Sequence, residues 1–187
     1  MTLIKSISGI RGTIGGKAGD GLSPIDVVKF TSAFARFIQN RSGKSRIKMV
    51  IGRDGRISGD MINRLVTGTL LGMGVDVIDG GLSTTPTVEM AVTGREADGG
   101  IILTASHNPK QWNALKLLNE TGEFINDKDG AEVLAIAAKG AVEYAAVDDL
   151  GRYEKDDRFI DEHIEKILEL PLVDAVAIKN RNFRIAI

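Results

Sequence analysis

The 187-residue sequence contains no cysteine. This absence excludes disulfide bonds, zinc sites built from thiolates and a cysteine nucleophile, and it fits the reducing cytoplasmic location that we expect. Long hydrophobic runs are missing as well, and none approaches the roughly 20 residues of a membrane-spanning helix. The first residues lack the basic and then apolar order of a secretory signal. We therefore expect no membrane association.

A surplus of charge of either sign is also absent. The chain has 24 lysines and arginines against 25 aspartates and glutamates, a formal net charge of -1. This balance gives no electrostatic reason to expect nucleic acid or a membrane surface as a partner. Hydrophobic residues make up 43% of the chain, which is enough for a full core and argues against disorder.

Short apolar strands alternate with amphipathic helices along the chain. The expected strands are 47–51, 75–79, 99–103 and the apolar run 114–118; the expected helices begin at Ser23-Pro24, Ser58 and Pro86 and continue with 128–139 and 159–168. The segment 142–153 is less regular and is expected to hold at most a short strand. This alternation predicts an α/β fold, a three-layer α-β-α domain with a mostly parallel mixed sheet.

The C-terminal residues predict a boundary. After a turn at 180–182, residues 183–187 have the pattern of a strand, and a strand needs a partner in a sheet. Either this strand pairs back into the first sheet or a second domain begins there. We divide the chain into a domain at 1–155, a helical linker at 156–182 and the start of a second, truncated domain at 183–187. The chain is then the N-terminal fragment of a longer protein with further domains.

A polar loop, Thr-Ala-Ser-His-Asn-Pro, follows directly after the strand expected at 99–103. Ligands of open α/β sheets gather at the carboxyl ends of strands, and the small residues leave the Ser106 hydroxyl accessible. Composition alone favours a simple polar turn over a site. A serine hydrolase is excluded, because Ala105 and His107 flank the serine where a nucleophile elbow has Gly-x-Ser-x-Gly.

Lys116 lies ten positions after this serine, inside the apolar run 114–118. If the run returns beside the strand that ends at Leu103, Lys116 comes near Ser106. A partly desolvated lysine has a lowered pKa and can accept a proton. The pattern alone favours another interpretation, a solvent-facing lysine that protects an edge strand from aggregation.

Two glycine-rich segments contain arginine. In Ser8–Gly12, Arg11 lies between glycines, and a forked guanidinium beside exposed backbone amides suits a phosphate. The Arg-Asp-x-Arg pattern within 52–59 favours a structural ion-pair network over ligand binding. No Walker motif and no dinucleotide-binding glycine pattern follows a strand, so nucleotide binding has no support. His163 lies among isoleucines and is expected to be half-buried packing.

These residues together resemble the α-D-phosphohexomutase family, which includes phosphoglucosamine mutase, phosphomannomutase and phosphoglucomutase. The serine loop with a lysine ten positions later carries the resemblance. The segments Ser-Gly-Ile-Arg-Gly at 8–12 and Gly-Arg-Asp-Gly-Arg-Ile-Ser-Gly at 52–59 follow in the family's order. The resemblance covers essentially the whole chain, as the family's first domain with the start of its second. It implies that the chain is the N-terminal fragment of a multidomain enzyme.

The resemblance implies interconversion of hexose 6-phosphate and hexose 1-phosphate through a phosphoserine at Ser106. Lys116 matches the general acid/base, Arg11 a contact of the phosphoserine, and His107 and Asn108 positions that support the substrate and the serine. It further implies a hexose or hexosamine phosphate as substrate and a hexose 1,6-bisphosphate as activator. The implied Mg²⁺ is bound by an oxygen of the phosphorylated Ser106 and by three aspartates of a second domain.

Some features depart from the family pattern. Ala114 stands where glycine is usual, and because alanine lacks glycine's freedom at positive φ, we expect a slightly different turn into the strand. Trp112 replaces a smaller aromatic residue. The Asp-x-Asp-x-Asp metal loop and the later sugar-selecting and phosphate-binding loops are not in this sequence, so the chain alone is expected to be inactive.

The form of the loop with Ala105 favours phosphoglucosamine mutase, with phosphomannomutase or phosphoglucomutase as the alternative. A phosphosugar-binding relative without catalysis is a further alternative, although a pure binder needs no acid/base lysine.

Overall fold

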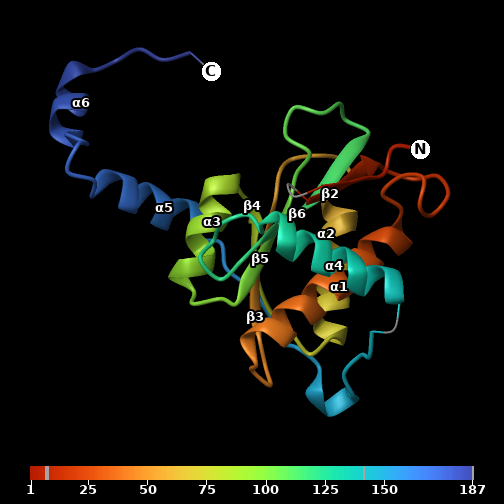
Figure 1. The fold of residues 1–187 in the computed structure, drawn as a ribbon. Coiled ribbons are helices and arrows are strands. Elements are labelled where there is room, and N and C mark those ends of the chain that lie inside the picture. The colour runs from red at the N-terminus through yellow and green to blue at the C-terminus, as the bar shows by residue number, and fades with distance from the viewer. Residues whose placement is uncertain (7–8, 141, 187) are drawn as a thin grey trace.

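The computed structural model describes residues 1–6, 9–140 and 142–186. Its strands form one seven-stranded sheet in the order β1-β2-β6-β5-β3-β4-β7 (Figure 1). The strands are β1 (Ile4–Ser6), β2 (Gly9–Thr13), β3 (Lys48–Arg53), β4 (Asp76–Leu82), β5 (Gly99–Leu103), β6 (Trp112–Leu118) and β7 (Tyr153–Lys155). The helices are α1 (Pro24–Ser42), α2 (Gly59–Gly72), α3 (Thr85–Gly94), α4 (Asp127–Lys139), the short 3₁₀ helix η1 (Val147–Asp149), α5 (Phe159–Leu168) and α6 (Ala175–Arg181).

The expected α/β class with a mixed sheet is confirmed. Within the described residues, β5, β3, β4 and β7 pair in parallel, whereas β6, β2 and β1 join the sheet through antiparallel pairings. The short connection from β5 to β6 explains the change of direction. A parallel return would need a crossover of about a dozen residues or more, whereas a short loop can only bring the next strand back antiparallel.

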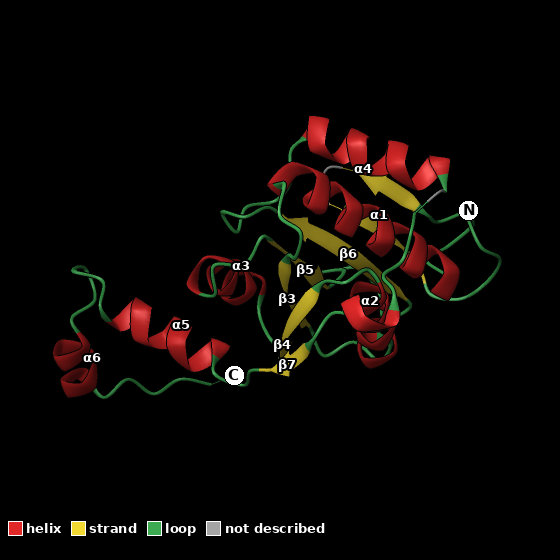
Figure 2. Cartoon of the chain, turned by 90° about the horizontal axis from the view of Figure 1, so that it is seen from below, coloured by secondary structure: helices red, strands yellow, loops and turns green. Residues whose placement is uncertain are grey.

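Helices cover both faces of the sheet, which gives three layers (Figure 2). In β3, Met49 and Ile51 face α1 and α2, whereas Val50 faces α3, because successive side chains of a strand point to opposite faces. Phe30 and Phe34 of α1 are at most 1% exposed, and burying each side chain contributes roughly 1.5–3 kcal/mol. The sheet therefore separates two apolar cores, the larger beneath α1, α2 and α4.

Capping residues fix the helix starts as the sequence indicates. Ser23 accepts a hydrogen bond from the Asp26 amide, and the Asp26 carboxylate accepts one from the Ser23 amide, which completes a capping box for α1. Thr84 caps α3 through the Thr87 amide. Ser58 precedes α2 as expected but makes no capping hydrogen bond.

The N-terminal and C-terminal segments differ from expectation. Residues 9–13 form strand β2. The sequence shows no strand pattern there, because Ile10 is the one large apolar side chain of this segment. Residues 175–181 form α6 and Asn182 caps it, so the expected turn at 180–182 is mostly helix. Residues 183–186 form no strand, and Ile187 lies outside the described residues. The domain boundary at 183 stays a prediction.

A buried ion-pair cluster holds α5 against the body of the domain. The Asp156 side chain is 3% exposed and accepts hydrogen bonds from Arg158 and Arg95, and Arg95 also pairs with Glu162. The guanidinium of Arg158, followed by that of Arg95, holds the pKa of Asp156 well below its usual range. The cluster links β7 and α5 to α3.

Two further contacts seat α5 on α3 and β4. The Phe159 ring packs on Gly80, where a Cβ atom would lie 2.2 Å from the ring, so only glycine fits there. His163 is half-buried, and its Nδ1 lies 2.9 Å from Thr87 Oγ1, which confirms the packing role expected for this histidine. In the described ranges, no helix is both long and apolar enough for a membrane span.

We expect Asp156→Asn to lower the free energy of unfolding by about 2 kcal/mol near neutral pH, because two arginines lose a buried charged partner. The stabilising effect of a carboxylate with a lowered pKa is fully present above the pKa of an unfolded aspartate, about 4. It is lost as the pH falls through the lower pKa of the folded state. The difference from the unmutated protein should therefore shrink in acid, which urea unfolding over a pH series measures.

Asp157→Asn is the matched control, because the neighbouring Asp157 side chain is 72% exposed and pairs with Lys155 at the surface. Its effect should stay within about 0.5 kcal/mol. Equal losses in the two variants, or a difference that persists unchanged in acid, would contradict the assigned role of the cluster.

Candidate active site

The serine loop, residues 104–111, connects β5 to β6 at the carboxyl end of the parallel strands. Thr104 and Ala105 are buried, whereas Ser106 and His107 are exposed and Asn108 is half-buried. The backbone of Ser106 has φ +53°, which lies in the left-handed region that residues other than glycine rarely adopt. The structure thus places the predicted serine at an exposed reversal of the chain, next to His107 and Asn108.

Side chains at the end of β3 anchor this loop. The Ser106 amide donates to Thr104 Oγ1 at 3.0 Å, and the same hydroxyl donates to Asp54 Oδ2 at 2.7 Å. The Asn108 amide donates to the Ala105 carbonyl oxygen at 3.0 Å, which closes the turn. The composition of this loop would be compatible with a simple polar turn. The serine loop, however, is linked to the end of β3 through the hydrogen bonds of Thr104 with Ser106 and Asp54.

Arg56 is the main support of the loop. Its side chain is 10% exposed, and its Nε donates to Asp54 Oδ2 at 3.1 Å. The remaining guanidinium hydrogens are directed at four carbonyl oxygens of the loop and the start of β6: Ser106 at 2.6 Å, Asn108 at 2.8 Å, Pro109 at 2.9 Å and Trp112 at 3.0 Å. The structural role expected for the Arg-Asp-x-Arg pattern is confirmed for Asp54 and Arg56, and what they hold is the candidate catalytic loop.

The strand after the loop returns beside β5 as expected. In β6, Lys116 lies opposite Ile102 of β5, and β6 is an interior strand with β2 on its other side. The interpretation of Lys116 as a guard of an edge strand is therefore wrong. Lys116 is half-buried, and its Nζ lies 5.4 Å from the centroid of the Phe124 ring.

Arg11 lies on the same face of the sheet as Lys116. It is directly opposite Ala114 across the antiparallel pair of β2 and β6, and cross-strand partners share a face with every second residue. Arg11 is half-buried, and its Nε has no hydrogen-bond partner among the described residues. Ser8, the first residue of the segment expected to bind phosphate, lies outside the described residues.

Gly9 explains why that segment is glycine-rich. Its φ is +110°, and a Cβ atom there would lie 2.1 Å from the Leu115 carbonyl oxygen. Glycine therefore lets β2 approach β6 closely enough to place Arg11 beside the strand of Lys116.

Ala114 stands where the family usually has glycine, and it lies in regular strand structure. Ala114 lies within β6, is buried and has no positive φ, so glycine's freedom is not required there. Its neighbour Asn113 is fully buried, donates to Ser58 Oγ at 2.9 Å and accepts from the Ala114 amide at 2.8 Å. No motif indicates that Asn113 and Ser58 join β6 to the start of α2.

The described residues do not supply a complete set of ligands for the predicted magnesium ion. In residues 1–6, 9–140 and 142–186, no group of three or more histidine, aspartate or glutamate side chains is placed to hold a metal. An oxygen on a phosphorylated Ser106 would be a single ligand.

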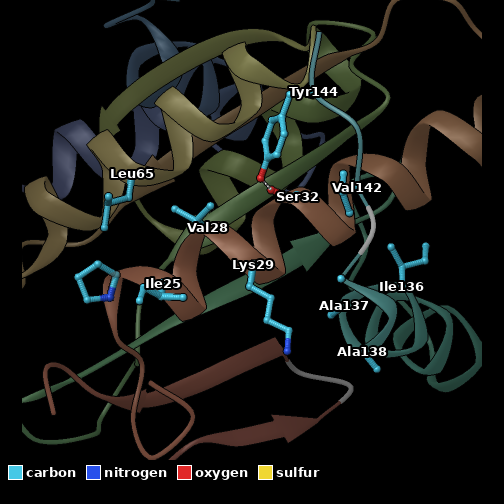
Figure 3. A pocket seen from close by; sticks show the side chains of 12 residues that line it. Ile25, Val28, Lys29, Ser32, Leu65, Ile136, Ala137, Ala138, Val142 and Tyr144 are labelled. Carbon is cyan, nitrogen blue, oxygen red and sulfur yellow. Dashed lines mark hydrogen bonds between the residues drawn. The ribbon is translucent and has the colours of Figure 1, made fainter. Parts of the chain in front are cut away.

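A cavity of about 540 Å³ lies between α1 and α4 (Figure 3). Ile25, Val28 and Ile136 give it a largely apolar lining, and Ser32 Oγ and Tyr144 OH lie 2.9 Å apart at its wall. It is on the face of the sheet opposite to Lys116, because α1 and α4 pack on Leu115 and Leu117. It is not part of the serine site.

Known proteins resemble this chain in sequence and fold. Residues 3–143 match the family model described as phosphoglucomutase/phosphomannomutase, alpha/beta/alpha domain I. A phosphoglucomutase/phosphomannomutase of Thermococcus kodakarensis is 36% identical over 172 residues, which cover 91% of this chain and 37% of the relative. A phosphoglucosamine/phosphogalactosamine mutase of Sulfurisphaera tokodaii is 32% identical over 182 residues, 96% of this chain and 37% of the relative.

A solved structure supports the same similarity. The crystal structure of a phosphoglucomutase/phosphomannomutase family protein from Burkholderia thailandensis superposes with a TM-score of 0.72 at 26% identity, over 89% of this chain and 36% of that one. The chain thus spans little more than a third of the length of these relatives.

The left-handed backbone at Ser106 predicts an order of stability between two variants. Ser106→Gly should be more stable than Ser106→Ala by about 1 kcal/mol, because φ +53° strains alanine but not glycine. Both variants remove the hydroxyl, so urea unfolding of the pair isolates the backbone effect.

The same pair at Ser42, in the last turn of α1, is the control. There alanine should be the more stable residue, since helical backbone disfavours glycine. The same order at both positions would contradict the strained conformation of Ser106.

Proposed function

Because the chain belongs to the phosphoglucomutase/phosphomannomutase family, we propose that it carries the phosphoryl-accepting serine of a phosphohexomutase. The enzyme would interconvert hexose 6-phosphate and hexose 1-phosphate through a phosphoserine at Ser106. The observation that carries the proposal is the exposed serine, fixed at the carboxyl end of β5, with Arg11 and Lys116 on one face of the adjoining strands.

The reaction has two half-steps of the same kind. In the first, the bond between phosphorus and Ser106 Oγ breaks while a bond to a sugar hydroxyl oxygen forms, which gives a hexose bisphosphate. The proton of that hydroxyl passes to the serine oxygen by way of Lys116, acting as general acid/base. After the bisphosphate turns over in the site, its other phosphoryl group returns to Ser106 Oγ and the proton moves in the opposite direction.

Arg11 has the donor chemistry that this reaction needs. Its guanidinium carries a fork of N–H groups that matches phosphate oxygens, and the buried Nε–H lacks a partner among the described residues. A phosphoryl oxygen would satisfy this group, whose isolation is otherwise costly. We assign Arg11 to the phosphoserine, and His107 and Asn108 to contacts with the sugar phosphate.

The substrate, activator and metal belong to the same proposal. A hexose or hexosamine phosphate is the expected substrate, and a hexose 1,6-bisphosphate is the expected activator because it phosphorylates Ser106. Mg²⁺ would need ligands other than the described residues, so no step is routed through it.

The preferred sugar phosphate is the finer part of the proposal. The form of the loop with Ala105 and the 32% identity to the Sulfurisphaera phosphoglucosamine/phosphogalactosamine mutase favour a glucosamine phosphate. The 36% identity to the Thermococcus phosphoglucomutase/phosphomannomutase favours the alternative, a glucose or mannose phosphate. Because Ser106, Lys116 and Arg11 are all present, a binding protein without turnover is not favoured.

Ser106→Ala should abolish both phosphorylation of the full-length protein and its mutase activity, because the oxygen that accepts the phosphoryl group is lost. Phosphorylation is measured with a labelled hexose 1,6-bisphosphate. Turnover is measured on glucosamine, glucose and mannose phosphates, with and without Mg²⁺, which also identifies the sugar. The control is Ser45→Ala, an exposed serine ahead of β3 at the other end of the strands. Normal turnover in Ser106→Ala would rule out the phosphoserine mechanism.

Lys116→Met should slow phosphoryl transfer by about 100-fold or more while the fold is retained, because a general acid/base is lost. Rapid-quench measurement of the first turnover follows the transfer itself. Lys48→Met, which replaces a half-buried lysine at the start of β3, should leave the rate unchanged. Equal rates in Lys116→Met and the unmutated enzyme would remove Lys116 from the reaction.

A further inference from the structure

All the N–H groups of Arg56 are already engaged within the protein. A guanidinium has five N–H donors. Nε–H donates to Asp54, Nη1 donates to the carbonyl oxygens of Pro109 and Trp112, and Nη2 donates to those of Ser106 and Asn108. No donor is left for a ligand, so Arg56 differs from Arg11, whose Nε–H is unpartnered among the described residues. Its effect on the site must pass through the loop.

The hydrogen bonds of Arg56 to loop carbonyl oxygens also determine where the neighbouring backbone N–H groups point. A peptide unit is planar and trans, so its N–H points opposite to its C=O, and the described residues contain no cis peptide. The Ser106 carbonyl faces Arg56, so the following N–H, that of His107, points away from the buried guanidinium. The Pro109 carbonyl also faces Arg56, so the N–H of Lys110 likewise points away from the guanidinium. Neither amide has an acceptor in the part of the chain that the structure describes.

The serine itself depends on the same support. A residue other than glycine is strained in the left-handed region and persists there only where surrounding contacts enforce it. Here the Ser106 amide is held by Thr104 and the Ser106 carbonyl by Arg56, on either side of the strained φ. Without these two hydrogen bonds, ordinary backbone conformations would be favoured at Ser106.

We propose that Arg56 is a positioning residue that holds Ser106 in its left-handed conformation and presents the His107 N–H beside the serine hydroxyl as a donor to a phosphoryl oxygen. The ligand class is a phosphate monoester or inorganic phosphate, since oriented backbone amides form anion-binding sites. The consequence for catalysis rests on the proposed function, whereas the binding of phosphate by the amide does not.

Arg56 contributes the directions of its hydrogen bonds to the serine loop rather than a net positive charge. The Asp54 carboxylate accepts from the Arg56 amide, from Arg56 Nε and from Thr104 Oγ1, so the positive charge is neutralised where it lies. A lysine would keep the charge but has three donors at one point instead of a planar fork. Arg56→Lys therefore separates the two contributions.

Histidine labelling makes the amide visible. The chain has two histidines, so ¹⁵N-histidine gives two backbone amide signals, and His163 on α5 is the internal reference. Titration with inorganic phosphate should shift the His107 signal saturably and leave that of His163 in place. In Arg56→Lys, the apparent affinity reported by His107 should fall about tenfold or more.

Arg64→Lys is the matched control, because Arg64 is 78% exposed on α2 and pairs only with Asp60 among the described residues. Its His107 signal should respond as in the unmutated protein. A His107 signal that ignores phosphate, or responds equally in Arg56→Lys, would overturn the proposal. If Arg56→Lys does not fold, as judged from the His163 signal, Thr104→Val replaces it, because that variant removes the support on the other side of Ser106.

Kinetics of the full-length protein test the consequence for catalysis. Arg56→Lys should lower kcat about 10- to 100-fold and change KM by less than about threefold, since a misplaced reacting group affects the transfer more than binding. An unchanged kcat in an active enzyme would overturn positioning by Arg56. Absence of turnover in the unmutated protein, with the His107 response intact, would instead overturn the proposed function and leave the phosphate-binding amide in place.

Discussion

The short connection between β5 and β6 is the constraint on which the site depends. It is too short for a crossover, so β6 must return antiparallel, beside β5 and at the edge of the parallel block. This return places Lys116 on the strand next to the serine loop. It also leaves the far side of β6 open for β2, which brings Arg11 to the same face. One change of strand direction thus places Lys116 on the strand after the serine loop and brings Arg11, which is far away in the sequence, to the neighbouring strand.

The periodic parts of the fold could be predicted from the sequence, because burial on one face leaves a pattern in the residues. The helices α1 to α4 carry buried apolar side chains at helical spacing, and the strands β3, β4 and β5 appear as short apolar runs. Strand β2 does not, because glycine and Arg11 occupy most of it and its place is fixed by pairing with β6.

The candidate site likewise has parts that the sequence indicates and parts that it does not. The serine loop could be placed at a strand end from the sequence, although composition alone favours a simple polar turn there. The family resemblance is what assigned roles to Ser106, Lys116 and Arg11. The role of Arg56 could not be found, because its partners are backbone carbonyl oxygens, and every residue has one. A pattern of side chains therefore indicates an ion pair with Asp54 but gives no information about the loop that covers the guanidinium. Ala114 shows the converse, since the position that departs from the family pattern has no positive φ and lies within a regular strand.

Two Asp-x-Arg turns in this chain show how far local chemistry determines a role. Asp54 and Asp156 each accept a hydrogen bond from the amide two residues later and bind the guanidinium of that same arginine. After β7, the Arg158 side chain remains 68% exposed and serves to neutralise a buried carboxylate. After β3, the Arg56 side chain is 10% exposed, because the serine loop folds over it and uses its remaining donors. The same turn is a structural ion pair in one place and the support of a candidate active site in the other. The difference lies in the antiparallel return of β6, which sends a loop over one turn and not over the other.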